Sequence, residues 1–592
     1  MPQIPPVFRA GIALLPLIGL LSSGTAEAQT KPAATESSPW GVSASSSSFK
    51  DRAHWFPKMA EAGVTTVRLF PEWRSFEPTA GTWTWNDGDV LLKSANENSL
   101  AINAILMGSP PGSKSVHAFP MENLDDWSRY VTAVVGRYWK QVRHWEVWNE
   151  GNGGFNDGHH TTADYAKLAV VTYAAAKKAD PQAKIGLTVA SFDAPYLHQT
   201  LLAMAKAGQP NSFDYLCIHP YEIADGLVDP DGEVPFLWMS HTLRGMLKAT
   251  VPEKVDAEIW ITEVGRRMTQ GDHPVTEQNA ATGLLKIYTM ALAQKIAQIQ
   301  WFEGQDPAGE DQGFGLLNRE GGERASYKSL KKLRALLGPA PKYLGWVTFG
   351  RDSRGYGFVF EGANGPALIA WMPAGQTGSI SFAEDVHVST SPRLHVQVKA
   401  GASLEVTDIP LFVGGLPPEF VERAKENATK NFPWGGDYSN TTLVSCEPGK
   451  VDGNRGIAQV GRADCPTISF PDGSSGILVQ GDIGHPVRFY VHPSFASFQT
   501  RTYYIRATVR RVASGNVGMN LLYEVADSQG RSPYPNTGKW GGFTDASGWQ
   551  TYTWQVNDAC FSKMWGYDLV LRPEQSVPFA IGRLEVSTEP LK

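Results

Sequence analysis

The sequence predicts an α/β protein: a (β/α)8 TIM barrel, followed by a small antiparallel β-domain and a C-terminal β-sandwich. Three observations support this fold class. Short apolar segments alternate with amphipathic helical patterns from Trp40 to about Leu337. After Gly338 the apolar residues follow the two-residue period of antiparallel strands. The chain has 592 residues. A single hydrophobic core rarely extends beyond about 250–300 residues, so several domains are expected.

Eight apolar segments are the expected barrel strands. They begin at Trp40, Thr65, Ala101, His144, Lys184, Phe213, Glu258 and Gln298. Most are continuous apolar runs, which indicates strands that are buried on both faces, as in a parallel sheet. Eight strands with intervening helices match one parallel barrel. A doubly wound open sheet is the alternative, but it usually carries a glycine-rich phosphate-binding turn, and the sequence shows none.

Helical patterns fill the gaps between these strands. Residues 51–62 and 124–142 carry apolar side chains at three- and four-residue spacing. Thr161 is the expected N-cap of another helix, and Gly63 lies where a C-cap belongs. We therefore place the barrel at residues 40–338.

The N-terminus has the pattern of a signal peptide at residues 1–28. Arg9 supplies a positive charge, an apolar stretch follows, and Ala26-Glu27-Ala28 is a small-x-small cleavage site. Cleavage after Ala28 would leave a polar leader at 29–39. No later segment is apolar enough to cross a membrane, so we expect a soluble protein that is secreted or periplasmic.

Two β-rich regions are expected after the barrel. Residues 339–415 read as the small antiparallel β-domain, and 419–592 read as the β-sandwich, with GGLPPEF between them as a linker. The sandwich region carries five tryptophans that invite a carbohydrate-binding interpretation. They are Trp434, Trp540, Trp549, Trp554 and Trp565. Aromatic residues also fill sandwich cores, so a purely structural role stays open.

Charge and cysteine content exclude several classes of partner. The formal net charge is −6 and no long basic run occurs, so nucleic acid and anionic membranes are not expected partners. Cys217 lies in an apolar strand and is expected to be a buried free thiol. Cys446, Cys465 and Cys560 occur late, and an exported protein could join two of them, but the sequence does not choose the pair.

Titratable residues occur at the ends of two expected barrel strands. Glu150 ends the fourth strand after Asn149, and Glu263 ends the seventh. Catalytic groups of parallel barrels lie at these strand ends. Cleavage of a glycosidic bond requires two carboxyl groups that flank the bond, and a separation of about 5 Å gives retention of configuration. The sequence therefore favours Glu150 and Glu263 as a catalytic pair.

On these residues the chain resembles clan A of the glycoside hydrolases over about residues 40–337. WEVWNEGN holds the Asn-Glu pair, WITEVG the second glutamate and CIHPY the histidine and tyrosine of strand six. EWRSFEPTAGTWTWN, from Glu72, resembles a stretch after strand two in several clan members. Within the clan the combination is most similar to family 39, with families 5 and 51 next. Gly151 follows Glu150, where family 39 often has proline.

The resemblance implies a retaining hydrolase with Glu150 as acid/base and Glu263 as nucleophile, without a metal or an organic cofactor. Tyr221 would donate a hydrogen bond to Glu263, with Arg68 close below. The remaining substrate contacts implied are Asn149 at the sugar 2-hydroxyl, His219 in the same subsite and Trp301 as an aromatic platform. A raised pKa is expected for Glu150, because it must carry a proton in the first step.

Several alternatives remain at this point. Glu146 shares the strand of Glu150 but is expected to lie deeper in the barrel. His159-His160 could suggest a metal site, although further ligands at suitable spacing are missing. The substrate is a poly- or oligosaccharide, and exo cleavage by an α-L-arabinofuranosidase or β-xylosidase competes with endo cleavage. A polysaccharide-binding matrix protein is the non-enzymatic alternative. The oligomeric state is not predicted.

Overall fold

The computed structural model of the chain describes residues 38–592, except 271–273, 309–311, 390–394, 451, 462–464, 481–483, 516, 527–531, 544–547 and 575–576. The expected signal peptide and residues 29–37 of the leader lie outside the described residues. Within the described part of the chain, no helix is both long enough and apolar enough to cross a membrane.

Eight parallel strands close into a barrel, as the sequence predicts. They are β1 (Trp40–Ser43), β2 (Thr66–Arg68), β3 (Ala101–Leu106), β4 (His144–Val147), β5 (Lys184–Ala190), β6 (Tyr215–His219), β7 (Glu258–Val264) and β8 (Gln298–Phe302). Neighbours in the ring are neighbours in the sequence, and β8 pairs with β1 to close it. Every expected strand segment is present, and the predicted (β/α)8 barrel is confirmed.

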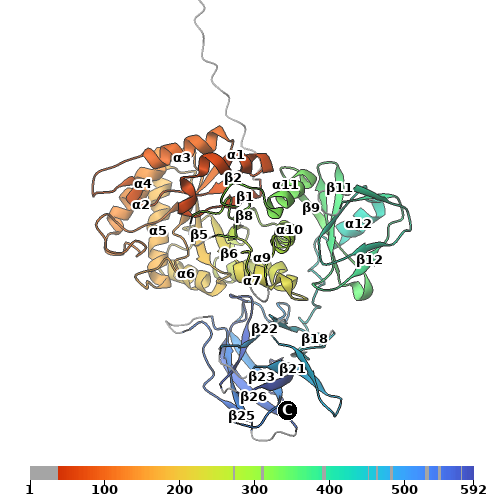
Figure 1. The fold of residues 1–592 in the computed structure, drawn as a ribbon. Coiled ribbons are helices and arrows are strands. Elements are labelled where there is room, and N and C mark those ends of the chain that lie inside the picture. The colour runs from red at the N-terminus through yellow and green to blue at the C-terminus, as the bar shows by residue number, and fades with distance from the viewer. Residues whose placement is uncertain are drawn as a thin grey trace, which may run out of the picture. The chain divides into compact units, whose positions relative to one another are not determined.

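Helices follow each strand and surround the barrel (Figure 1). They are α1 (Arg52–Ala62), α2 (Trp73–Phe76), α3 (Asn86–Glu97), α4 (Leu124–Tyr138), α5 (Thr162–Ala179), α6 (Ala194–Lys206), α7 (Tyr221–Asp225), α8 (Glu233–Leu237), α9 (Met239–Thr250), α10 (Glu277–Ala293) and α11 (Ala325–Leu337). Thr161 caps α5 in a capping box with Asp164, and Gly63 ends α1 in the left-handed conformation. Both predicted caps are confirmed.

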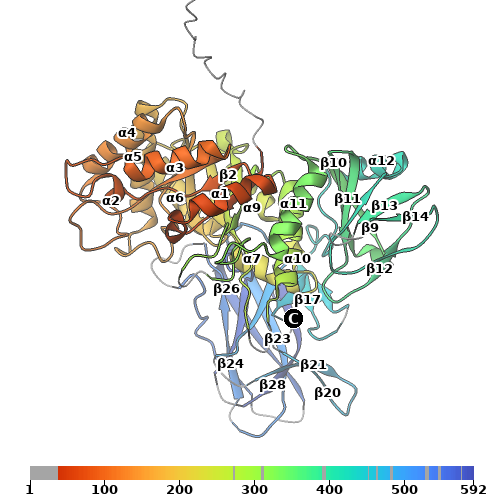
Figure 2. The same ribbon diagram turned by 45° about the horizontal axis from the view of Figure 1, so that its top comes forward.

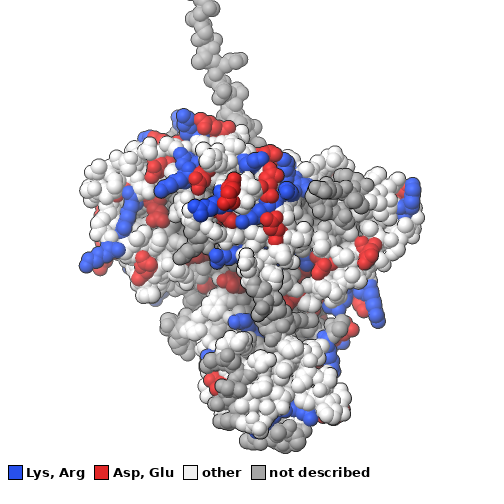
Figure 3. Space-filling view, viewed as in Figure 1, with Lys and Arg blue, Asp and Glu red and all other residues white. Residues whose placement is uncertain are grey.

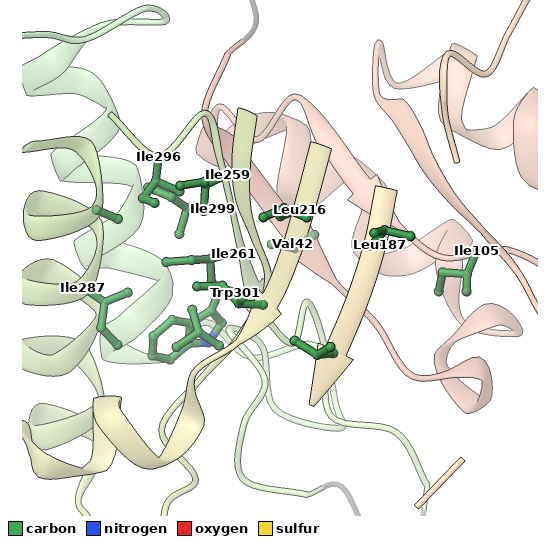
Figure 4. Packing of buried hydrophobic residues seen from close by; sticks show 14 of the residues in the cluster. Val42, Ile105, Leu187, Leu216, Ile259, Ile261, Ile287, Ile296, Ile299 and Trp301 are labelled. Atoms are coloured by element: carbon green, nitrogen blue, oxygen red, sulfur yellow. The ribbon is translucent and has the colours of Figure 1, made fainter. Parts of the chain in front are cut away.

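The main hydrophobic core lies between the barrel strands and the surrounding helices. Aliphatic side chains of β1, β7 and β8 meet Ile287 of α10 there (Figure 4). Trp301 of β8 belongs to this layer and is fully buried. Side chains that point to the helices are therefore apolar, which leaves the opposite side of each strand for polar residues near the barrel axis.

A small antiparallel sheet follows α11. Its strands, together with a two-stranded ribbon of β12 and β15, are β9 (Lys342–Phe349), β10 (Gly355–Gly362), β11 (Gly365–Trp371), β12 (Gly378–Ile380), β13 (Val386–Ser389), β14 (His395–Val398), β15 (Leu404–Val406) and β16 (Leu411–Gly414). The sheet lies beside α10 and α11 in both views (Figures 1 and 2). The expected linker is wrong in its second half: α12 (Pro418–Asn427) forms there, and Phe420 and Val421 pack into the core of this sheet.

Two antiparallel sheets form the C-terminal region and share one hydrophobic core. The first contains β17 (Leu443–Cys446), β18 (Asn454–Arg455), β20 (Thr467–Ser469), β21 (Ser475–Val479), β23 (Arg501–Arg511), β26 (Trp549–Ala559) and β28 (Phe579–Ser587), and the second contains β19 (Ile457–Val460), β22 (Val487–Val491), β24 (Val517–Tyr523), β25 (Gly541–Phe543) and β27 (Leu569–Pro573). The predicted sequence of β-rich regions after the barrel is confirmed.

Charged residues of both signs are interspersed over the barrel surface shown in Figure 3. No large area of a single sign is visible on this face. Such a mixed surface lacks the continuous positive stripe that binding to a nucleic acid backbone requires. The expectation that nucleic acid is not a partner stays a prediction.

Candidate active site

The strand ends of the barrel surround a cleft of about 800 Å³. Glu150 and Glu263 both line it, from the ends of β4 and β7. One carboxylate oxygen of each glutamate and a ring nitrogen of His219 lie within 4.8 Å of one another. The structure thus brings the two glutamates together in one cleft, at the edge of the barrel where the sequence analysis expects them.

Local backbone geometry directs both carboxylates to the cleft. Immediately after β4, Trp148 and Glu150 have φ values of 64° and 47°, in the left-handed region that side chains other than glycine rarely adopt. Between β7 and β8 the pairing register shifts between Ile261 and Val264, next to Glu263. Irregular pairing of this kind re-aims side chains at barrel rims. In a regular strand the side chains would alternate between the two faces. The strained and irregular backbone at these positions departs from that alternation.

Glu263 is held by two donors on opposite sides. Nη1 of Arg68 lies 2.5 Å from its Oε1, and the hydroxyl of Tyr221 donates to its Oε2 over 3.0 Å. Burial and the negative charges of Glu263 and Glu150 raise the pKa of Tyr221, so its phenol remains protonated and donates. Hydrogen bonds to a carboxylate favour its ionised form, which is the form that attacks as a nucleophile.

Arg68 is anchored from below by Glu146. Its Nε and Nη2 donate to the two carboxylate oxygens of Glu146 over 2.9 and 3.0 Å, and both side chains are buried. Burial lowers the pKa of the guanidinium, but the charges of Glu146 and Glu263 outweigh it, and the net pKa lies above the ordinary value. Glu146 lies beneath the cleft and does not line it, as expected from its position in the strand.

Asn149 is oriented by the same arginine. Nη2 of Arg68 donates to its Oδ1 over 2.8 Å. With the oxygen engaged below, the amide Nδ2 remains available as a donor, and Asn149 lines the cleft. A donor beside the two glutamates is what the expected contact with a sugar hydroxyl requires.

Glu150 is paired with His219, and its pKa differs from the expectation. Nδ1 of His219 lies 2.8 Å from Oε1 of Glu150, and Nε2 lies 3.0 Å from the hydroxyl of Thr262. Burial raises the pKa of Glu150. The hydrogen bond and charge of His219, together with the charge of Arg68, lower this pKa by more than burial raises it. The net pKa lies below its usual range. The expected raised pKa is thus wrong, because the effect of burial is outweighed by His219 and Arg68.

Trp301 is not in the cleft. Its indole is fully buried, its Nε1 donates to the backbone oxygen of Phe314, and Figure 4 shows it among core side chains. The next residue, Phe302, lines the cleft, together with Phe314 and Phe155. Because successive strand residues point to opposite faces, an error of one position exchanges a core residue for a cleft residue. The geometry contradicts a sugar platform at Trp301 and offers Phe302 instead.

The other proposed sites occupy ordinary structural positions. The ring of His160 stacks on Phe119, with centroids 5.0 Å apart, and its backbone nitrogen donates to Asn156. Cys217 is a buried free thiol, as predicted. Among the described residues, the grouping whose geometry could hold a metal ion is Glu150, His219 and Glu263. The cation of Arg68, 2.5 Å from Glu263, would repel a divalent ion there.

The tryptophans of the C-terminal region divide into two groups. Trp434 and Trp554 are buried and fill cores. Trp540 and Trp565 are 47% and 37% exposed, and Trp565 stacks on Tyr534 with ring centroids 5.0 Å apart. Trp549 is half-buried and lies between these groups, and Tyr534 is itself buried. The exposed apolar surface therefore belongs to Trp540 and Trp565 alone, whereas the buried rings explain the packing of the sheets.

Comparisons with known proteins agree with this fold. No family model matches the chain. An endo-1,4-β-xylanase of Hypocrea jecorina is 29% identical over 135 residues, which is 21% of this chain and 38% of the xylanase. A family 39 glycoside hydrolase from Bacteroides cellulosilyticus WH2 superposes with a TM-score of 0.52 at 17% identity, over 64% of this chain and 81% of the other.

A family 39 β-xylosidase from Caulobacter crescentus has a TM-score of 0.48 at 16% identity, over 64% of this chain and 95% of that one. The match to the xylanase spans little more than a third of that enzyme. At 17% identity, the likeness to the Bacteroides enzyme shows a shared fold. This chain therefore has the barrel fold found in a family 39 glycoside hydrolase.

Proposed function

We propose that this chain is an exported, retaining glycoside hydrolase that acts on a poly- or oligosaccharide. The observation that carries the proposal is the pair of glutamates, whose nearest ligand oxygens lie within 4.8 Å in an open cleft. Retaining glycosidases have their two carboxyl groups about 5 Å apart, whereas inverting enzymes separate them by about 6.5 Å or more to admit a water molecule. The spacing therefore supports double displacement.

In the first step, Glu263 attacks the anomeric carbon and the bond to the leaving oxygen breaks. Glu150 transfers its proton to that oxygen, and a covalent glycosyl–enzyme ester forms at Glu263. Arg68 and Tyr221 orient the attacking carboxylate through the bonds of 2.5 and 3.0 Å. Asn149 donates to the 2-hydroxyl of the sugar, where the contact strengthens in the transition state.

In the second step, Glu150 accepts a proton from water, and the oxygen of that water attacks the anomeric carbon. The ester breaks and Glu263 leaves as a carboxylate. A lowered pKa suits Glu150 for this basic role. In the first step Glu150 must instead carry a proton. A sugar bound in the cleft displaces water from Glu150, and the increased burial raises the pKa of its carboxyl group.

Relatives supply the first candidates for the glycan. The partial likeness to an endo-1,4-β-xylanase makes β-1,4-xylan the first polymer to test, with an exo-acting β-xylosidase or α-L-arabinofuranosidase as the alternative mode. Export rests on the pattern at residues 1–28. The exposed rings of Trp540 and Trp565 support a carbohydrate-binding role for the C-terminal sheets.

Product analysis tests the proposal directly. The protein is incubated with xylan, xylo-oligosaccharides and aryl glycosides, and the configuration of the first product is followed by NMR. We expect release of a sugar that retains its anomeric configuration. Oligomer ladders indicate endo cleavage and monosaccharide alone indicates exo cleavage. An inverted first product would contradict the assignment of Glu263 as nucleophile.

The non-catalytic alternative predicts a different result. A polysaccharide-binding protein would bind these glycans without turnover across the panel, and substitution of Glu150 would leave its affinity nearly unchanged. Hydrolysis that persists in excess chelator supports the metal-free mechanism. Loss of activity that is restored by added zinc would support a metal ion held by Glu150, His219 and Glu263.

A further inference from the structure

The cleft contains a buried arginine that the proposed mechanism does not use. Arg266 lies three residues after Glu263, in the loop between β7 and α10, and it lines the cleft. It is 5% exposed, and its Nε has no hydrogen-bond partner among the described residues. In the described part of the chain, no carboxylate oxygen lies within 4.0 Å of the guanidinium nitrogens of Arg266, which is the distance of an ion pair. Buried arginines are normally paired, so this one is poised for a ligand.

Helix α10 leaves room for this side chain at a glycine. A Cβ added at Gly283 would lie 2.5 Å from Cδ and 3.3 Å from Cγ of Arg266. Glycine inside a helix costs about 1 kcal/mol relative to alanine, so a residue with a side chain would otherwise be favoured here. The close approach explains the glycine: it lets the arginine stem lie against the helix and keeps the guanidinium at the cleft.

Two arginines and one acidic residue line the cleft near Arg266. Burial lowers the pKa of its guanidinium, and the negative charge of Asp225, the last residue of α7 and also a cleft residue, raises it in part. Arg267 lines the same side, and its Nε donates to the backbone oxygen of Gln312 over 3.1 Å. Glu72 lines the cleft after β2, across the ring of strands from β7. Charge is therefore unevenly distributed across the cleft.

We propose that Arg266 binds an anionic group on the glycan, a uronate carboxylate or a sulfate ester, and so selects acidic glycans as substrates. This inference rests on the proposed hydrolase function. A neutral hydroxyl would accept a hydrogen bond from the guanidinium, but the buried charge would remain compensated only in part, by Asp225. A carboxylate or sulfate satisfies both requirements, because its paired oxygens match the planar fork of arginine.

Matched polymers test this inference. The first pair is glucuronoxylan, a β-1,4-xylan with uronate branches, and the same polymer after its carboxyl groups have been reduced to alcohols. The second pair is a sulfated xylan and its desulfated form. Hydrolysis is measured as kcat/KM. Binding is measured separately, by calorimetry on the Glu150→Gln variant at low and high salt, so that affinity is known even without turnover.

The variants separate charge from structure. Arg266→Gln removes the charge, Arg266→Lys keeps it, and Gly283→Ala displaces the arginine stem. Arg137→Gln is the matched control, because this exposed arginine pairs with Asp89 on the outer helices. We expect wild type to prefer one acidic polymer over its neutral form by about tenfold to a hundredfold, the usual strength of a charge-assisted bond.

Arg266→Gln and Gly283→Ala should abolish that preference, because kcat/KM on the acidic polymer falls at least about tenfold more than on the neutral polymer. Arg266→Lys should restore part of it. The pair of polymers that shows the preference identifies the anionic group as a carboxylate or a sulfate. An equal loss on acidic and neutral polymers, or no preference in either pair, overturns the inference. Hydrolysis of both forms at equal rates leaves the hydrolase proposal intact, whereas charge-dependent binding without any hydrolysis contradicts that proposal alone.

Discussion

The barrel and the C-terminal sheets each hold two carboxylates near one buried cation, but only one of these clusters opens to a cleft. In the barrel, Arg68 joins Glu146 to Glu263. In the C-terminal region, Lys563 lies 3.4 Å from Asp568, and the backbone nitrogens of Ser562 and Lys563 donate to Glu524 over 2.8 Å. Glu263 lines the 800 Å³ cleft, whereas Glu524 and Asp568 are fully buried.

The difference shows that buried charge alone does not identify a site. The Glu524 cluster anchors a loop whose Met564 oxygen accepts a hydrogen bond from the backbone of Phe192 in the barrel, which indicates a structural role. Burial and the charge of Asp568 raise the pKa of Glu524 well above its usual range. A perturbed carboxylate becomes a catalytic candidate when it also faces a space that holds a substrate.

Removal of the nucleophile should produce the largest contrast between the two clusters. We expect Glu263→Ala to lower kcat by at least about 10⁴-fold, because the covalent step is lost. Azide should restore turnover and give a glycosyl azide of inverted configuration. Glu524→Gln should leave kcat within about twofold in the same assay. Azide rescue of Glu150→Ala with an inverted product would instead exchange the two assignments.

Substitution in the core layer should affect stability more than binding. Trp301→Ala is expected to lower the free energy of unfolding by about 3–5 kcal/mol, since it leaves a large cavity. Phe302→Ala should instead raise KM, because Phe302 lines the cleft. Chemical denaturation and steady-state kinetics on both variants provide the test. A large rise in KM for the conservative Trp301→Phe, with stability unchanged, would favour the original platform assignment.

The Glu524 cluster should make the free energy of unfolding depend on pH. Folded Glu524 has a raised pKa, so its contribution to stability is complete below the unfolded value of about 4.3 and is lost as the pH rises above it. Glu524→Gln cannot ionise. We expect its free energy of unfolding, measured by urea unfolding, to rise relative to that of the wild type as the pH increases from 4.5 to 8. A difference that is constant with pH would show that Glu524 is not the responsible group.

The smallest effect concerns the pH profile of the acid/base. His219 lowers the pKa of Glu150, so His219→Gln should raise it and move the alkaline limb of kcat/KM to higher pH. A decrease in kcat of about tenfold or less is expected, since His219 positions Glu150 without reacting itself. The measurement is a pH–rate profile on one aryl glycoside. A limb that moves to lower pH would contradict the assigned direction.

The order of strands and helices in the barrel could be predicted from local patterns of apolar residues. Continuous apolar runs, three- and four-residue spacing, and the caps at Gly63 and Thr161 identify the barrel elements, because burial on both faces leaves a strong signal in each strand. The expected linker was partly wrong, since α12 is stabilised by contacts with a sheet that is distant in sequence. Local pattern carries no information on such contacts.

The sequence by itself determined the barrel and the proposal of Glu150 and Glu263 as a pair, because strand order and strand ends follow from the alternation of strands and helices. The tertiary structure decided the rest. It placed Trp301 in the core and Phe302 in the cleft, gave Glu150 a lowered pKa through His219, and left Arg266 buried in the cleft that the two glutamates line. These properties depend on distances between residues far apart in the chain, and such distances exist only after the barrel has closed.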